Sequence, residues 1–195
     1  MLIIMAGLPG TGKSAIARQL ARDLPAVVLD KDAIRAALFP PAYIDYSTPQ
    51  DDWCMTIMLQ VAAYVWQKTP QACVILDGRT FSRSYQVQTV RQFAGQHGVP
   101  LHILECMCPE ETARQRLEHD ANAARHPAGN RDVTLYHTIK ARFEPIPEPK
   151  LIVNTDTSFE ECIAACLAYL SPKLHGTVMD AAMHTDTNRP NKNRG

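Results

Sequence analysis

Short apolar runs alternate with amphipathic stretches along most of this 195-residue chain. The apolar runs are rich in branched residues and have the length of buried strands, whereas the stretches between them carry apolar residues at helical spacing. The strand-like runs are 2–5, 26–29, 73–76, 99–107 and 151–153. The helix-like stretches are about 13–24, 51–68, 82–97, 109–117, 135–143 and 159–170. This alternation predicts an α/β fold with a parallel sheet of five strands, covered by helices on both faces.

A proline-rich segment, 39–50, and a polar segment, 122–130, interrupt the alternation. Loops of this length within a compact domain tend to be functional. The apolar spacing fades after Pro172, and 185–195 is almost entirely polar. We therefore expect one domain over 1–171 and a disordered tail over 172–195.

The composition is that of a globular protein, with 46% apolar and 21% charged residues. Twenty basic and twenty acidic residues cancel, which disfavours a long nucleic acid as partner. No apolar run is long enough to span a membrane, and the apolar start of the chain is typical of a strand rather than of a signal peptide. The six cysteines contain no C-x-x-C pair, so we expect reduced core thiols in a cytoplasmic protein.

A glycine-rich segment between the first strand and the first helix fits G-x-x-x-x-G-K-[ST] at every fixed position. Its residues are Gly7, Leu8, Pro9, Gly10, Thr11, Gly12, Lys13 and Ser14. Backbone N–H groups of such a P-loop surround a phosphate, and the helix that follows adds positive charge from its N-terminus. Lys13 is expected to bridge the β- and γ-phosphates of ATP, and Ser14 to offer its hydroxyl to Mg²⁺. A P-loop by itself indicates a nucleoside triphosphate, not a kinase.

The second strand ends in two acids, Asp30 and Asp32, with Arg35 three residues later. The carboxyl ends of parallel strands face the ligand crevice, and residues two apart in an extended chain point to the same side. One acid could hold a metal-bound water while the other accepts the proton of an acceptor hydroxyl. Arg35 could bind an anionic group of the acceptor. Alternatively, one acid caps a helix and Arg35 lies on a solvated face.

Asp77 ends the third apolar strand, which is the form of the second magnesium-supporting motif of P-loop proteins. Asp30 competes with Asp77 for this role, and the sequence does not rank them. Arg79 follows closely and either contacts the substrate or is a surface arginine. Ser82 is expected to cap the next helix.

A segment of about 114–131 contains four arginines and is expected to form a helical lid. Phosphoryl transfer is accelerated when a cation from a mobile segment approaches the γ-phosphate. The candidates are Arg114, Arg116, Arg125 and Arg131.

Together these motifs resemble the small P-loop kinases that have an AAA-type ATP-binding domain. They are similar to the kinase domain of polynucleotide kinase and, more distantly, to shikimate, gluconate and adenylylsulfate kinases and the zeta toxins. The residues that carry the resemblance are 7–14, 30–35, 74–77, 109–111, 116–117 and 142–145. The resemblance implies a three-layer P-loop fold like that of nucleoside monophosphate kinases, with a five-stranded parallel sheet and a helical lid.

The resemblance also implies roles for single residues. Asp32 would be the general base, Arg35 would grip a phosphate of the acceptor, Asp30 would support Mg²⁺, and Arg116 would be the lid arginine. The sequence departs from the family pattern at 118–120, where relatives often carry another arginine, and at Gly78 and Arg79 after the third strand.

We therefore expect an ATP- and Mg²⁺-dependent kinase that phosphorylates a hydroxyl of a small-molecule or nucleotide-like acceptor. Two alternatives remain open: a regulatory P-loop ATPase or switch without an acceptor, and a kinase of the toxin or antibiotic-resistance type. An acceptor base at Asp32 distinguishes a kinase from a switch, which does not need one. The sequence predicts neither the acceptor nor the oligomeric state.

Overall fold

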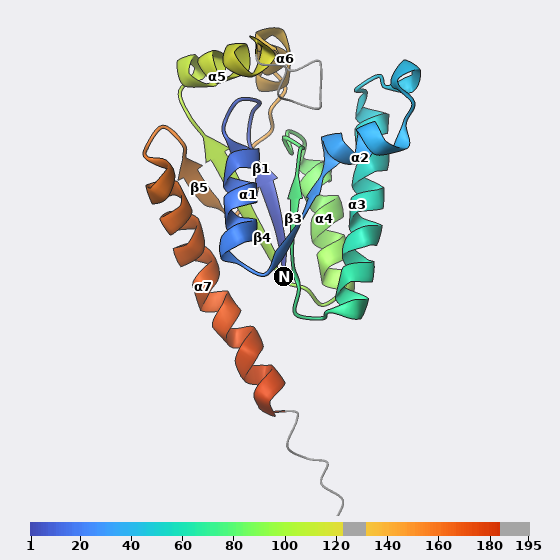
Figure 1. Ribbon diagram of the computed structural model, residues 1–195, viewed down its shortest axis with the longest axis vertical. Helices are drawn as coiled ribbons and strands as arrows, with labels where there is room; N and C mark the ends of the chain where they lie inside the picture. Colours follow the sequence, from blue (N-terminus) through green and yellow to red (C-terminus); the bar gives the residue numbers. More distant parts are fainter. Residues whose placement is uncertain (123–131, 184–195) are drawn as a thin grey trace, which may run out of the picture.

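The computed structural model describes residues 1–122 and 132–183 (Figure 1). Five strands form one sheet in the order β2-β3-β1-β4-β5, and every neighbouring pair is parallel. The strands are β1 (Leu2–Ala6), β2 (Ala26–Asp30), β3 (Cys73–Asp77), β4 (Leu101–Met107) and β5 (Leu151–Asn154). The predicted sheet of five parallel strands is confirmed.

The helices of the described residues follow the expected alternation, with two short additions after β2. They are α1 (Lys13–Asp23), α2 (Lys31–Leu38), the short 3-10 helix η1 (Pro41–Tyr43), α3 (Thr48–Lys68), α4 (Ser84–Gln96), α5 (Glu110–Asn122), α6 (Val133–Lys140) and α7 (Phe159–Met183). Helix α2 was not expected as an element, because its eight residues are too few to show a clear period.

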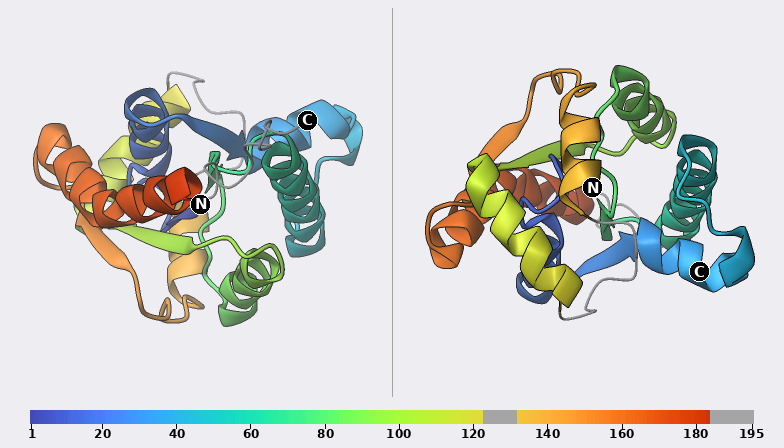
Figure 2. Two further views of the ribbon diagram at one scale, coloured as in Figure 1. Left: turned by 90° about the horizontal axis from the view of Figure 1, so that it is seen from below. Right: turned by 90° about the horizontal axis from the view of Figure 1, so that it is seen from above.

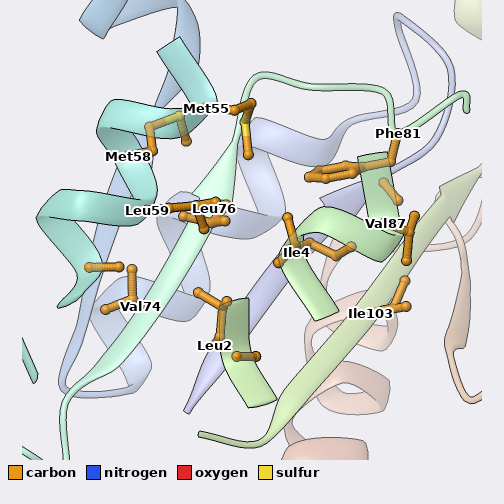
Figure 3. Packing of buried hydrophobic residues seen from close by; sticks show 14 of the residues in the cluster. Leu2, Ile4, Met55, Met58, Leu59, Val74, Leu76, Phe81, Val87 and Ile103 are labelled. Carbon is orange, nitrogen blue, oxygen red and sulfur yellow. The ribbon is translucent and has the colours of Figure 1, made fainter. Parts of the chain in front are cut away.

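Helices cover both faces of the sheet, which confirms the three-layer arrangement (Figure 2). Residues of β1 alternate between the layers: Leu2 and Ile4 pack with α3 and α4, whereas Ile3 and Met5 pack with α1 and α7. Figure 3 shows the first of these layers, where Met55 and Met58 of α3 lie over the sheet. Because β1 is buried on both faces, it reads as a continuous apolar run.

The last helix is longer than expected. Helix α7 continues to Met183, beyond the expected end of the domain at 171, and its end extends away from the sheet (Figure 1). The expected boundary at 171 and the disorder beyond it stay predictions. Pro172 removes one backbone hydrogen bond and crowds the preceding turn, but Leu174 and Val178 continue the helical spacing of Leu170. The expected disorder of 184–195 concerns residues outside the described part.

The carboxyl ends of the strands meet at one edge, beneath α5 and α6 (Figure 1). At this edge the P-loop follows β1, Asp30 ends β2, and Asp77 ends β3. Asp30 and Asp77 are register partners on adjacent strands. The topology therefore brings three sequence-predicted motifs to one place. Within the described residues, none of the helices is both long and apolar enough to cross a membrane.

Candidate functional site

The P-loop wraps around the side chain of Lys13. Its Nζ donates hydrogen bonds to the carbonyl oxygens of Gly7, at 2.8 Å, and Leu8, at 2.6 Å. Gly7, Gly10 and Gly12 all have positive φ angles. At Gly7 a Cβ atom would lie 2.2 Å from the carbonyl oxygen of Cys106, so the close approach of the loop to β4 requires glycine. The backbone thus forms a phosphate-sized turn at the start of α1.

A pocket of about 670 Å³ is lined in part by the P-loop. This volume is in the range of small-molecule and nucleotide sites. Its lining includes Gly12, Lys13, Ser14, Asp30, Arg116, Thr155 and Phe159. We refer to it as the nucleotide pocket.

Arg116 of α5 is held over this pocket by the turn after β5. Its Nη1 donates to Oγ1 of Thr155, at 3.1 Å, and its Nη2 donates to the Thr155 carbonyl oxygen, at 2.7 Å. The Thr155 hydroxyl donates in turn to the carbonyl oxygen of Thr11 in the P-loop, at 3.1 Å. Arg116 is therefore fixed beside the loop and carries its charge toward the phosphate position.

A second pocket is also lined by Lys13 and Ser14. Its charged lining consists of Lys13, Lys31, Asp32, Arg35, Asp51, Arg79 and Arg142, and Tyr46, Ser82 and Gln86 add polar groups. We refer to it as the acceptor-side pocket. Lys13 and Ser14 line both pockets, so the two spaces meet where the end of a bound triphosphate would lie.

Asp32 lies in a network of buried charges. Arg35 Nη1 donates to Asp32 Oδ1 at 2.5 Å, and Lys31 Nζ lies 3.4 Å from the same oxygen. Asp51, from the first turn of α3, also binds both cations: it accepts from Lys31 at 2.8 Å and from Arg35 Nη2. Burial lowers the pKa of the Arg35 guanidinium, but Asp51 and Asp32 raise it by more, so the net shift is upward. Two cations, Lys31 and Arg35, thus fix the position of Asp32, and a second acid, Asp51, holds both of them.

The expectation that Asp30 and Asp32 point to the same side of an extended chain is wrong. Helix α2 begins at Lys31, and Asp30 is its N-cap: its Oδ1 accepts from the backbone N–H groups of Asp32, at 2.8 Å, and Ala33, at 3.3 Å. Asp30 consequently lines the nucleotide pocket, whereas Asp32 lines the acceptor-side pocket. The capping alternative is confirmed for Asp30, but Arg35 is only 2% exposed and does not lie on a solvated face.

Asp77 is buried, and its Oδ1 has no hydrogen-bond partner among the described residues. An orphaned carboxylate oxygen at the end of β3, the strand next to the P-loop strand β1, is the kind of group that a hydrated Mg²⁺ would satisfy. The described residues contain no cluster of three or more His, Cys, Asp or Glu side chains that could hold a metal alone. The donor set fits an ion that keeps its waters and binds substrate phosphates.

The other predicted arginines lie in different environments. Arg79 is 4% exposed and lines the acceptor-side pocket, so the surface alternative is wrong for it. Arg114 is exposed and pairs with Glu111 and Glu118 on its own helix, away from both pockets. Arg125 and Arg131 lie outside the described residues.

Three residues at the site were missed by sequence reasoning: Lys31, Asp51 and Thr155. Thr155 directly follows β5, and the rule that strand ends face the crevice could have identified it. Lys31 lies between two residues that were singled out. Asp51 is in the first turn of a predicted helix, but nothing in the sequence indicates that this turn faces Arg35.

The fold and the site define a P-loop protein with the architecture of small kinases. A family model described as an AAA domain matches residues 2–146. The chain therefore belongs to this AAA-domain family, which confirms the resemblance drawn from its motifs. A comparison with curated protein sequences finds no match.

Solved structures with the same fold include kinases. A candidate kinase from Chloroflexus aurantiacus has a TM-score of 0.69 and 22% identity, covering 88% of this chain and 96% of that chain. A gluconokinase from Sinorhizobium meliloti has a TM-score of 0.66 and 15% identity, covering 92% and 95%. The APS kinase of Mycobacterium tuberculosis, in complex with AMPPNP and APS, has a TM-score of 0.61 and 19% identity, covering 87% and 96%. At these identities the similarity establishes the fold.

Proposed function

We propose that the protein is an ATP-dependent kinase that transfers the γ-phosphoryl group to a hydroxyl of a small-molecule or nucleotide-like acceptor. One observation carries this proposal: the nucleotide pocket and the acceptor-side pocket share Lys13 and Ser14, and the carboxylate of Asp32 lines the acceptor-side pocket. A switch or simple ATPase has no use for a second, charged pocket beside the γ-phosphate. The gluconokinase and APS kinase folds, whose names indicate small acceptors, support the same function.

The P-loop would bind the triphosphate through its backbone N–H groups. On binding, Lys13 would exchange its contacts to the loop carbonyl oxygens for the β- and γ-phosphates. Arg116, fixed by Thr155, would add positive charge on the open side of the phosphates. Because charge develops on the transferred group, these cations lower the barrier by electrostatic stabilisation.

Bound Mg²⁺ would neutralise phosphate charge and orient the γ-phosphoryl group. Ser14 would offer its hydroxyl as a direct ligand. Asp77, with its orphaned Oδ1, and Asp30, on the neighbouring strand, would hold the waters of the ion. We assign Asp77 the larger share, because Oδ1 of Asp30 is already occupied by the cap of α2.

Asp32 would act as the general base. The acceptor oxygen attacks the γ-phosphorus, the bond from that phosphorus to the bridging oxygen breaks, ADP leaves, and the acceptor proton passes to Asp32. Arg35 and Lys31 hold the carboxylate in place for this transfer.

We further propose that the reaction occurs in the cytoplasm, because the six cysteines are free thiols and ATP is the phosphoryl donor.

The test is transfer of label from γ-labelled ATP to a panel of metabolites, nucleosides and nucleotides, with the native protein and Asp32→Asn. We expect label in at least one acceptor and a fall in kcat of about 100-fold or more in the variant. The dissociation constant for ATP, measured by calorimetry, should stay within about threefold, since Asp32 does not line the nucleotide pocket.

Asp23→Asn is the matched control, because Asp23 is an exposed acid at the end of α1. If label appears only as free phosphate across the panel, and Asp32→Asn releases it at the native rate, the protein is an ATPase and the kinase proposal is wrong. Growth arrest or drug resistance on expression would instead direct the search for the acceptor toward the toxin or resistance class.

A further inference from the structure

The acceptor-side pocket carries an excess of positive charge. Five cationic side chains line it, against two acids, Asp32 and Asp51. One of the five is Lys13, which belongs to the nucleotide. Lys31 and Arg35 are balanced by the two acids. The remaining cations, Arg79 and Arg142, are not used by the reaction proposed above.

Two successive acids in the first turn of α3 bind two of the guanidinium groups. Asp51 binds Arg35, and its neighbour Asp52 binds Nη2 of Arg79 at 2.5 Å. Asp52 also accepts a hydrogen bond from the hydroxyl of Tyr85, at 3.1 Å, which fixes its orientation. Paired acids on successive residues therefore orient Arg35 and Arg79, two arginines that both line the pocket.

Both arginines keep an unsatisfied donor. The Nε atoms of Arg35 and Arg79 are buried and have no hydrogen-bond partner among the described residues. The two side chains are 2% and 5% exposed. A buried N–H of a charged group without an acceptor is costly, and native proteins rarely leave one unless a ligand or water completes it.

Arg142 adds a third guanidinium at the rim. It follows α6, is exposed, lines the same pocket, and forms no side-chain hydrogen bond or ion pair with any described residue. An exposed arginine beside two buried and unsatisfied ones matches a ligand that has several oxygen atoms and negative charge. Guanidinium groups bind phosphate and carboxylate through paired N–H···O bonds.

We propose that the acceptor carries an anionic oxygen group, a phosphate or a carboxylate, in addition to the hydroxyl that is phosphorylated, and that Arg79 and Arg142 bind this group. This inference rests on the proposed kinase function. Arg35 is assigned a different part: both of its terminal nitrogens are occupied by acids, so it positions Asp32.

The experiment compares acceptors that differ only in charge. The native protein is assayed with Mg²⁺-ATP and three matched sets: glucose, gluconate and glucose 6-phosphate; ribose, ribonate and ribose 5-phosphate; adenosine and AMP. We expect an anionic member to be phosphorylated with kcat/KM about 100-fold or more above its neutral counterpart, since a site built for a charged group rejects the analogue that lacks it. Preference for the acid or for the ester identifies carboxylate or phosphate as the group.

Two variants then test the residues. Arg79→Gln and Arg142→Gln should each raise KM for the anionic acceptor about tenfold or more and leave KM for ATP within about threefold. Arg91→Gln, an exposed arginine on α4 outside both pockets, is the control. Because Arg79 is buried, Arg79→Lys and the exposed Arg142→Gln keep the test valid if Arg79→Gln does not fold.

The outcomes separate the two proposals. If a neutral alcohol is phosphorylated as well as or better than its anionic counterparts, or if Arg142→Gln and Arg79→Lys both leave KM for the anionic acceptor unchanged, the inference is wrong while the kinase function stands. If no acceptor is labelled and only free phosphate forms, the kinase function itself fails.

Discussion

Gly7 is the residue at which the P-loop is least tolerant of a side chain. It has a φ of +122°, and an added Cβ would lie 2.2 Å from the backbone oxygen of Cys106. Backbone cannot move aside as a flexible side chain can. The first glycine of the motif is therefore required by the packing of the loop against β4 as well as by the phosphate.

Gly7→Ala should lower the free energy of unfolding by about 2 kcal/mol or more, because positive-φ strain and a clash with backbone act together. Gly98→Ala is the matched control: Gly98 also has a positive φ, of +62°, but its Cβ would meet nothing within 4 Å. Strain alone should cost Gly98→Ala about 1 kcal/mol. Urea unfolding of both variants measures the difference, and equal losses would contradict the clash.

Glu144 is a residue whose role depends on a distant helix. Its carboxylate accepts from the hydroxyl and the backbone N–H of Ser84, each at 2.6 Å, and from Arg83 at 2.9 Å. These bonds, first of all that from the Ser84 hydroxyl, hold the pKa of Glu144 at about 2, well below the usual 4.5.

The expected cap of α4 by Ser82 is wrong. Helix α4 begins at Ser84, its N-cap is Arg83, and Glu144 accepts a hydrogen bond from the backbone N–H of Ser84.

The low pKa of Glu144 makes the stability of the fold fall as the pH is lowered. A carboxyl with a depressed pKa in the folded state stabilises the fold above pH 4.5 and loses this contribution as the pH falls toward about 2. Urea unfolding should therefore show a higher free energy of unfolding for the native protein than for Glu144→Gln at pH 6. The difference between the two free energies should narrow between pH 4.5 and 3. Glu160→Gln, at an exposed site on α7, is the control. A gap that stays constant over this range would rule out the assigned bonds.

At the scale of elements, the first turn of α3 supplies the acid that pairs with the charged residues of α2. Helix α3 was predicted from its apolar spacing, but α2 was not, and the two helices pack together. Their contact is where Asp51 meets Lys31 and Arg35. The position of the proposed base thus depends on the packing of two helices, not on the Asp-x-x-Arg spacing alone.

Asp51→Asn should leave two buried cations paired to Asp32 alone. We expect a loss of about 2 kcal/mol in the free energy of unfolding and a fall of about tenfold in kcat, with KM for ATP unchanged. Asp51→Glu should recover part of kcat if the carboxylate is what matters. Asp45→Asn, an exposed acid in the preceding loop, should have little effect. Thermal unfolding and steady-state kinetics test this, and a native kcat in Asp51→Asn would show that Asp32 needs no such support.

At the scale of the whole molecule, the sheet order places the P-loop strand β1 in the centre, between β3 and β4. This order brings the ends of β1, β2 and β3 to one edge, under the helices α5 and α6 (Figure 1). Helix α5 passes so close to the P-loop that a Cβ on Gly10 would lie 2.6 Å from the carbonyl oxygen of Ala113. A ligand in the loop would therefore contact several elements at once and stabilise the whole domain.

Mg²⁺-ATP at about 100 times its dissociation constant should stabilise the fold by about 2.7 kcal/mol, which corresponds to a rise in Tm of roughly 5–10 °C. Lys13→Ala should abolish most of this rise, because the lysine is at the centre of the loop. Lys68→Ala, at the exposed end of α3, should retain it. Differential scanning fluorimetry with and without nucleotide measures the shift, and an equal shift in Lys13→Ala would exclude the P-loop as the site.

The sequence by itself determined the sheet of five parallel strands, the P-loop and the acids at the ends of β2 and β3. Each of these depends on residues close together in the chain: apolar spacing sets strand or helix, and the glycines and lysine of one short turn set the phosphate site. For the same reason the sequence predicted Asp30, Asp32 and Asp77 as site residues, whereas Arg116 was predicted from the resemblance to small P-loop kinases.

Only the tertiary structure decided how these residues are shared between two pockets. It placed Asp30 on the nucleotide side and Asp32 on the acceptor side, because α2 begins between them. It also paired Asp51 with Arg35 and Asp52 with Arg79, which belong to different elements. Such contacts arise from the order of strands and the packing of helices, and local spacing carries no information about them.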